Sequence, residues 1–135
     1  MDNREAVRVQ GNVRTRWATS FAQRLRGLIG RCPEWLGDGG VLVIAPCSDI
    51  HTFGMRRDLD VAFLDASGKV LASYVAVGPH RRIRCTGAVA VLERFSLGNG
   101  RGGACCLSWA RDAWYRKGDY VVLGDRCALD AARRV

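Results

Sequence analysis

The chain lacks any long apolar segment, since none of its uninterrupted apolar runs approaches the roughly 20 residues that a membrane-spanning helix needs. Its first residues, MDNREAVRVQGN, carry charges and have no apolar stretch of the kind found in signal peptides. We therefore expect a cytoplasmic globular protein with no membrane partner. With 135 residues, of which 48% are hydrophobic, residues 1–135 fit one domain whose core requires neither disulfides nor metal.

No Cys-x-x-Cys pair occurs, which removes the main support for a zinc ribbon or a thioredoxin-like redox site. In a reducing compartment the six cysteines are expected to be thiols rather than three disulfides: Cys32, Cys47, Cys85, Cys105, Cys106 and Cys127. The adjacent pair Cys105–Cys106 fits either a redox-sensitive site or two small buried side chains, and the second role is the commoner one. We expect no cofactor.

Lysine is scarce, with 2 residues against 19 arginines, and the net charge is +8. A basic balance raises the possibility of nucleic-acid binding through phosphate neutralisation. However, the basic residues are spread from Arg4 to Arg134, and the densest cluster, His80-Arg81-Arg82-Ile83-Arg84, has no interleaved aromatic residue on which a base could stack. Charge alone therefore leaves nucleic-acid binding a less favoured alternative.

The N-terminal third combines a β-type pattern with one helical pattern. Residues 7–17, VRVQGNVRTRW, alternate as a half-exposed hairpin or a pair of short edge strands would. Ser20 as N-cap and Gln23 at the capping-box position predict a helix start. Phe21, Leu25 and Leu28 would then share its apolar face, and Gly30 would end it.

The remaining pattern is mostly that of strands. Continuous apolar runs predict buried strands over residues 41–45 and 59–64, and the turn at 65–68 leads into a strand ending near 77. Further strands are expected over 87–93 and 120–124. The predicted fold is mainly β, α+β in detail, as a compact antiparallel β-sandwich or barrel-like domain with one or two short helices.

Several motifs resemble those of the DUF192 family, an uncharacterised conserved group of bacterial and archaeal proteins. RLRGLIGR, residues 24–31, is similar to the family's R-x-x-GLM-x-R, with Ile29 in place of its usual Met. IHTFGM, followed by LDV and FLD, is similar to IHT-x-x-M…IDVVFLD, and Val91-Leu92-Glu93 resembles VLEL. The resemblance covers about residues 17–123 and implies a β-rich fold with no established activity. Segment 94–117 is longer than expected of the family, and its role is open.

The stretch CSDIHTFGM, residues 47–55, holds the chemically richest residues of the chain. Cys47, His51 and Met55 form a soft ligand set that would suit Cu(I), but a strand would separate successive members by about 13 Å. Cys47 with His51 as its base would suit a small thiol enzyme, although no oxyanion turn accompanies them. The structural alternative is that these side chains pack in the core or hold a turn.

A pocket with polar groups over an apolar floor is the hypothesis that we favour. Asp60 and Glu93 fall within apolar strands, where an unpaired carboxylate is costly, and Arg24 is an expected partner for one of them. The predicted ligand-binding residues are Arg24, His51, Thr52, Met55, Asp60 and Glu93. The sequence thus favours a non-enzymatic binding or accessory module, whose partner is an unidentified small molecule or protein.

Overall fold

Strands dominate the computed structural model, which describes residues 7–8, 15–37, 40–96 and 114–121. No helix among these residues is long and apolar enough to cross a membrane. The two helices are α1 (Phe21–Arg26) and α2 (Pro33–Leu36). The strands are β1 (Val7–Arg8), β2 (Thr15–Ala18), β3 (Val41–Ile44), β4 (Asp49–His51), β5 (Leu59–Leu64), β6 (Val70–Val77), β7 (Arg82–Arg84), β8 (Ala90–Phe95) and β9 (Tyr120–Val121).

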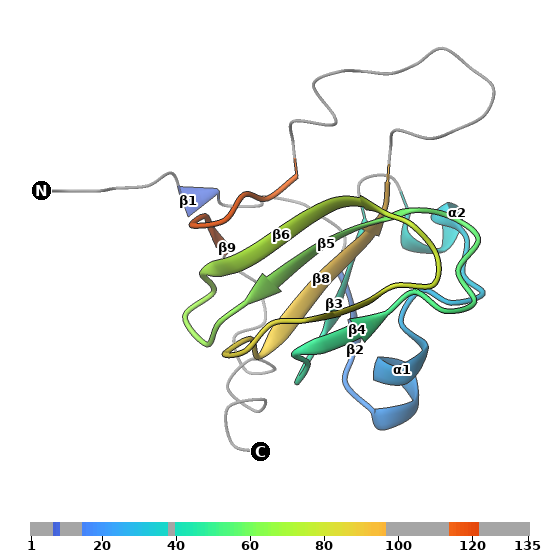
Figure 1. Ribbon diagram of the computed structural model, residues 1–135, viewed down its shortest axis with the longest axis horizontal. Helices are drawn as coiled ribbons and strands as arrows, with labels where there is room; N and C mark the ends of the chain where they lie inside the picture. The colour runs from blue at the N-terminus through green and yellow to red at the C-terminus, as the bar shows by residue number, and fades with distance from the viewer. Residues whose placement is uncertain (1–6, 9–14, 38–39, 97–113, 122–135) are drawn as a thin grey trace, which may run out of the picture.

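A five-stranded sheet in the order β2-β3-β8-β5-β6 forms the centre of the fold (Figure 1). All its neighbouring pairs are antiparallel except β2 and β3, which run parallel. Two small sheets, β1-β9 and β4-β7, complete the described part. The prediction of a mainly-β fold with short helices is confirmed. The main sheet is mixed rather than purely antiparallel, and it does not close into a barrel.

The central strands are buried on both faces, which explains why their sequences are continuous apolar runs instead of alternating patterns. All six residues of β5 are buried, and side chains alternate between two core clusters. Val41 and Val43 of β3 belong to one cluster, together with Trp114 and Tyr115. Leu42 and Ile44 belong to the other, which lies on the face that carries α1 and β4.

The capping box at the start of α1 is present as predicted. The Ser20 hydroxyl accepts a hydrogen bond from the Gln23 backbone N–H, and the Gln23 side chain accepts one from the Ser20 N–H. The helix ends at Arg26, however, because Gly27 leaves it with a φ of 52°. The predicted apolar face is therefore wrong in part: Leu28 is buried beyond the helix, whereas Phe21 and Leu25 are 75% and 58% exposed.

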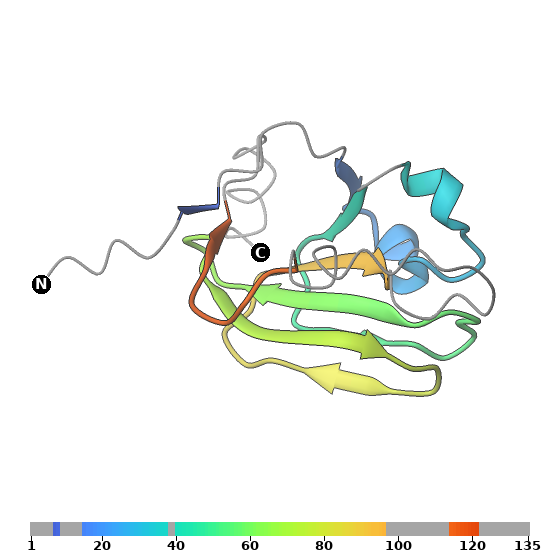
Figure 2. The ribbon, with the colours of Figure 1, turned by 90° about the horizontal axis from the view of Figure 1, so that it is seen from above.

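Three elements were not expected from the sequence. β4, in the stretch whose secondary structure the sequence left open, pairs with β7 in the basic cluster at residues 80–84, and α2 forms one helical turn after Cys32. Figure 2 shows β7 at the side of the molecule opposite both helices. Residues 97–113, which include Cys105–Cys106, lie outside the described residues, as does the chain after 121.

Asp60 is one of three buried polar residues of the described chain, and it is fully paired. One carboxylate oxygen accepts a hydrogen bond from Arg94 Nε at 2.8 Å, and the other accepts one from the Ala76 backbone N–H at 2.9 Å. Asp60 and Arg94 face each other across β5 and β8, on the side that packs against Trp114. The partner of Asp60 is thus Arg94, and the expectation that Arg24 could play this role is wrong.

We predict that Asp60→Ala lowers the free energy of unfolding by about 3–5 kcal/mol, because it removes the buried carboxylate that accepts hydrogen bonds from Arg94 Nε and the Ala76 N–H. Urea unfolding measures the change. Asp49→Ala is the matched control, since the Asp49–Arg82 ion pair is solvent-exposed and worth at most about 1 kcal/mol. Equal losses in the two variants would contradict the structural role assigned to Asp60.

Candidate ligand pocket

A cavity of about 490 Å³ opens between α1, β4 and strand β8 of the main sheet. Its volume lies in the range of small-molecule sites. It brings together four of the six predicted site residues. The lining residues are Phe21, Arg24, Leu25, Arg26, Gly27, Leu28, Ile29, Ile44, Pro46, Cys47, Ser48, Asp49, Ile50, His51, Met55, Leu59, Ala88, Val89 and Glu93.

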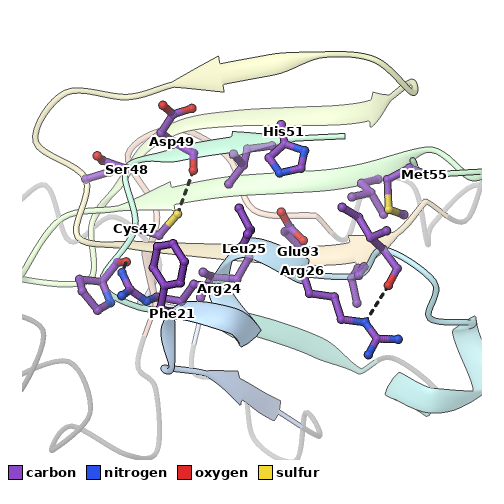
Figure 3. A pocket seen from close by; sticks show the side chains of 18 of the residues that line it. Phe21, Arg24, Leu25, Arg26, Cys47, Ser48, Asp49, His51, Met55 and Glu93 are labelled. Carbon is purple, nitrogen blue, oxygen red and sulfur yellow. Dashed lines mark hydrogen bonds between the residues drawn. The ribbon is translucent and has the colours of Figure 1, made fainter. Parts of the chain in front are cut away.

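The carboxyl group of Glu93 is the deepest polar group of this cavity. Glu93 projects from the middle of β8 into the pocket (Figure 3) and is only 3% exposed. No hydrogen bond or ion pair reaches its side chain within the described part of the chain, Arg24 included, so the expected Arg24 ion pair does not form here. Burial raises the pKa of Glu93 to about 7. The group is therefore partly neutral and partly ionised near neutral pH.

Gly27 allows the backbone to pass close to this carboxyl group. A Cβ atom at position 27 would lie 3.2 Å from Glu93 Oε2, and its positive φ is a conformation that other residues rarely adopt. The C-terminal end of α1 can therefore cover Glu93 without a side chain filling the space beside it.

Two nitrogen atoms from other elements add to the polar lining. His51, at the end of β4, directs its ring into the same space (Figure 3), and its Nδ1 is buried with no hydrogen-bond partner. Arg24 on α1 donates from Nη1 to the Pro46 carbonyl oxygen at 3.0 Å, while its Nε is buried and has no partner. Buried polar atoms are normally satisfied, so three such groups around one cavity are unusual.

The rest of the pocket is mainly apolar. Its floor includes Leu28, Ile44, Leu59 and Met55, all of which are buried in the same core cluster. Met55 reaches the pocket because a turn after β4 returns the chain, with the Met55 N–H donating to the Thr52 carbonyl oxygen. The exposed side chains of Phe21 and Leu25 stand at its entrance.

Phe21 and Leu25 were missed as site residues because their spacing was assigned to packing against the core. The signal that could have placed them was the pair Gly27 and Gly30, which limits α1 to less than two turns. Such a short helix cannot bury an apolar face of its own, and it leaves both side chains beside the opening.

Thr52 and Asp60, by contrast, do not line the cavity. Thr52 is completely buried, where its hydroxyl donates to the Gly78 carbonyl oxygen at 2.7 Å and accepts from the Arg81 N–H at 2.9 Å. These bonds fasten the turn after β4 to the segment between β6 and β7. Asp60 is held by Arg94 on the other face of the sheet. Both residues are thus occupied with structural bonds.

Cys47 lines the pocket with its thiol donating to the Asp49 carbonyl oxygen at 3.2 Å. The pKa of Cys47 lies above its ordinary value mainly because the thiol is buried, and the nearby Glu93 and Asp49 charges raise it further. An activated nucleophile needs the opposite shift. Within the described residues, moreover, no group of three or more His, Cys, Asp or Glu side chains is arranged as metal ligands would be.

Comparison with protein families agrees with the motifs and the fold. The model of DUF192, described as "Uncharacterized ACR", matches residues 4–99. The chain belongs to the DUF192 family. The match begins before the motifs noted in the sequence and ends within segment 94–117. No curated protein matches the chain significantly.

Two solved structures are similar to this DUF192 protein. A protein of unknown function from Novosphingobium aromaticivorans aligns with a TM-score of 0.60 and 20% identity, covering 80% of this chain and 73% of its own. A putative transcription regulator from Sinorhizobium meliloti aligns with a TM-score of 0.51 and 18% identity, covering 61% and 67%. At these identities the similarity establishes the fold alone.

We predict that Glu93→Gln stabilises the protein by an amount that grows as the pH rises from about 4.5 to about 7 and then stays constant. The pKa of Glu93 is about 7 in the folded protein, against an ordinary value of 4.5. As the pH rises from about 4.5 to about 7, Glu93 therefore ionises in the unfolded chain before it does so in the folded protein. The free energy of unfolding falls over this pH range as a result. The amide removes this loss, which amounts to about 3 kcal/mol. Urea unfolding should show that gain near pH 8 and almost none near pH 4.5. A gain that does not depend on pH would contradict the assignment.

We also predict that iodoacetamide alkylates Cys47 more slowly than free cysteine near neutral pH, because burial disfavours its thiolate. Peptide mass spectrometry resolves the individual sites, and exposed Cys32 serves as the internal reference. Alkylation of Cys47 faster than that of free cysteine would instead indicate an activated nucleophile.

Proposed function

We propose that this protein is a non-enzymatic module that binds a small amphipathic molecule in the pocket beneath α1. The unpartnered, buried carboxyl group of Glu93 at the bottom of the cavity is the observation that carries the proposal. An isolated buried carboxyl costs folding free energy, and a ligand that donates hydrogen bonds to it recovers that cost. The apolar floor around Leu28, Met55 and Leu59 supplies the hydrophobic part of the contact.

The chemistry of the lining defines the ligand further. An ammonium or other cationic donor is the natural partner of Glu93, because it favours the ionised carboxylate over the protonated acid. An aliphatic portion suits the floor, and Phe21 and Leu25 can cover it at the entrance. His51 Nδ1 and Arg24 Nε offer further polar contacts nearer the rim. The expected ligand is therefore a small alkylamine-like molecule.

A thiol enzyme that uses Cys47 and His51 is supported less well. Its nucleophile would carry a raised pKa, and within the part of the chain that the structure describes the Cys47 thiol donates to the Asp49 carbonyl oxygen and not to a base. Cys47 and His51 instead lie around a mainly apolar cavity that has the Glu93 carboxyl group in its lining. Binding, rather than catalysis, fits the lining as a whole.

The test is a titration with n-pentylamine, with pentanoate as the anionic counterpart, followed by amide chemical shifts. The amine should shift the signals of Ile44, Met55 and Glu93, and its affinity should rise by up to about tenfold from pH 6 to pH 8 as the carboxyl ionises. Glu93→Gln should weaken amine binding by at least about tenfold.

Glu34→Gln is the matched control, because Glu34 is an exposed acid on α2 that does not line the pocket. This variant should keep the wild-type affinity. Affinity that falls as the pH rises, or preference for pentanoate, would show that the head group is an acceptor and would contradict the cationic ligand. Absence of binding by either probe at millimolar concentration would contradict the proposed pocket ligand itself.

A further inference from the structure

A second, smaller cavity of about 300 Å³ lies between α1, α2 and β2. Its lining differs in charge from that of the Glu93 pocket, because three arginines contribute to it and no acidic residue does. It is lined by Arg16, Trp17, Ala18, Ala22, Gln23, Arg26, Gly27, Arg31, Trp35 and Leu42. Arg26 and Gly27 border both cavities.

The indole of Trp35 holds two of these arginines close together. The guanidinium carbon of Arg16 lies 4.4 Å from the ring centroid, and that of Arg31 lies 4.2 Å from it. Such cation–π contacts stabilise a guanidinium group but leave its positive charge uncompensated. Trp35 thus gathers two like charges at the wall of one cavity.

Donor groups in this cavity are also left without partners. Arg31 Nε is buried and makes no hydrogen bond. Arg26 donates from Nε to the Ile29 carbonyl oxygen at 3.0 Å, and the structure shows no bond from its two terminal nitrogens. The cavity therefore offers several guanidinium N–H groups for which the described residues provide no acceptor.

Some other arginines of the described chain have an acidic partner. Arg82 pairs with Asp49, and Arg94 pairs with Asp60. Among the described residues, by contrast, no ion pair involves Arg16, Arg26 or Arg31. Glu34 precedes Trp35 in the sequence and is the nearest acid along the chain to Trp35 among the described residues. Hydrogen bonds are the main cause that lowers the pKa of Glu34, and the cation that adds to this lowering is Arg57 rather than one of the three arginines. Within residues 15–37, 40–96 and 114–121, the three arginines thus have no acidic partner.

The geometry points to a binding site for a small phosphate-type dianion, held by Arg16, Arg26 and Arg31 beside Trp35. Guanidinium groups bind phosphate oxygens through paired N–H donors, and a dianion would neutralise charges that otherwise repel one another. The volume suits a phosphate group with a small organic substituent. This site is separate from the Glu93 pocket and does not depend on the function proposed for it.

Isothermal titration calorimetry of the full chain at low salt tests the site, with inorganic phosphate and ribose 5-phosphate as probes. Both should bind, and Arg31→Gln should weaken them by at least about tenfold. Arg16→Gln should also weaken binding, and because Arg16 is exposed it provides a second variant if Arg31→Gln unfolds. Thermal unfolding shows which variants remain folded.

Arg56→Gln is the matched control, since it removes the same charge from an exposed arginine outside the cavity. Its affinity for both probes should stay within about twofold of the wild type. Equal weakening in Arg56→Gln, or no binding of either probe, would overturn the site. A single-stranded oligonucleotide that binds while the small phosphates do not would likewise overturn it, and would assign the arginines to a phosphodiester backbone.

Discussion

Burial of the main sheet on both faces is the constraint from which the other features follow. Strands β3, β5 and β8 expose almost no side chain, so a polar residue on them cannot be solvated by turning outward. Asp60 meets this constraint with two hydrogen bonds, one of them to Arg94 on the facing strand. Glu93 lies one residue before Arg94 and so projects to the opposite face, where a cavity replaces the partner.

Helix α1 separates two cavities whose charged residues differ. On one side an acid that burial keeps partly neutral lies over an aliphatic floor, and on the other three arginines line a cavity that has no acidic residue in its lining. Neither arrangement is what stability alone would favour, because each contains polar groups that lack partners. Polar groups without partners are commonly found at binding sites, where the ligand supplies the missing hydrogen bonds or counter-charge.

The sequence predicted the parts of the structure that depend on local pattern. The β5 run, the turn into β6 and the Ser20–Gln23 capping box are all set by neighbouring residues. The Asp60–Arg94 pair could not be predicted in the same way, because it depends on the register between two strands far apart in sequence. Likewise, Glu93 was recognisable as a costly residue, but only the packing of a very short α1 over β8 leaves the space that it faces.

The bond from Asp60 to Ala76 also affects the outer strand of the sheet. Ala76 has a positive φ of 55°, and the β5–β6 register shifts between Leu59 and Val61. The outward edge of β6 therefore departs from a regular ladder where Tyr74 and Val75 are exposed. A strand of another molecule cannot continue an irregular ladder, so the same carboxylate that neutralises Arg94 helps to protect this apolar edge from intermolecular β-pairing and aggregation.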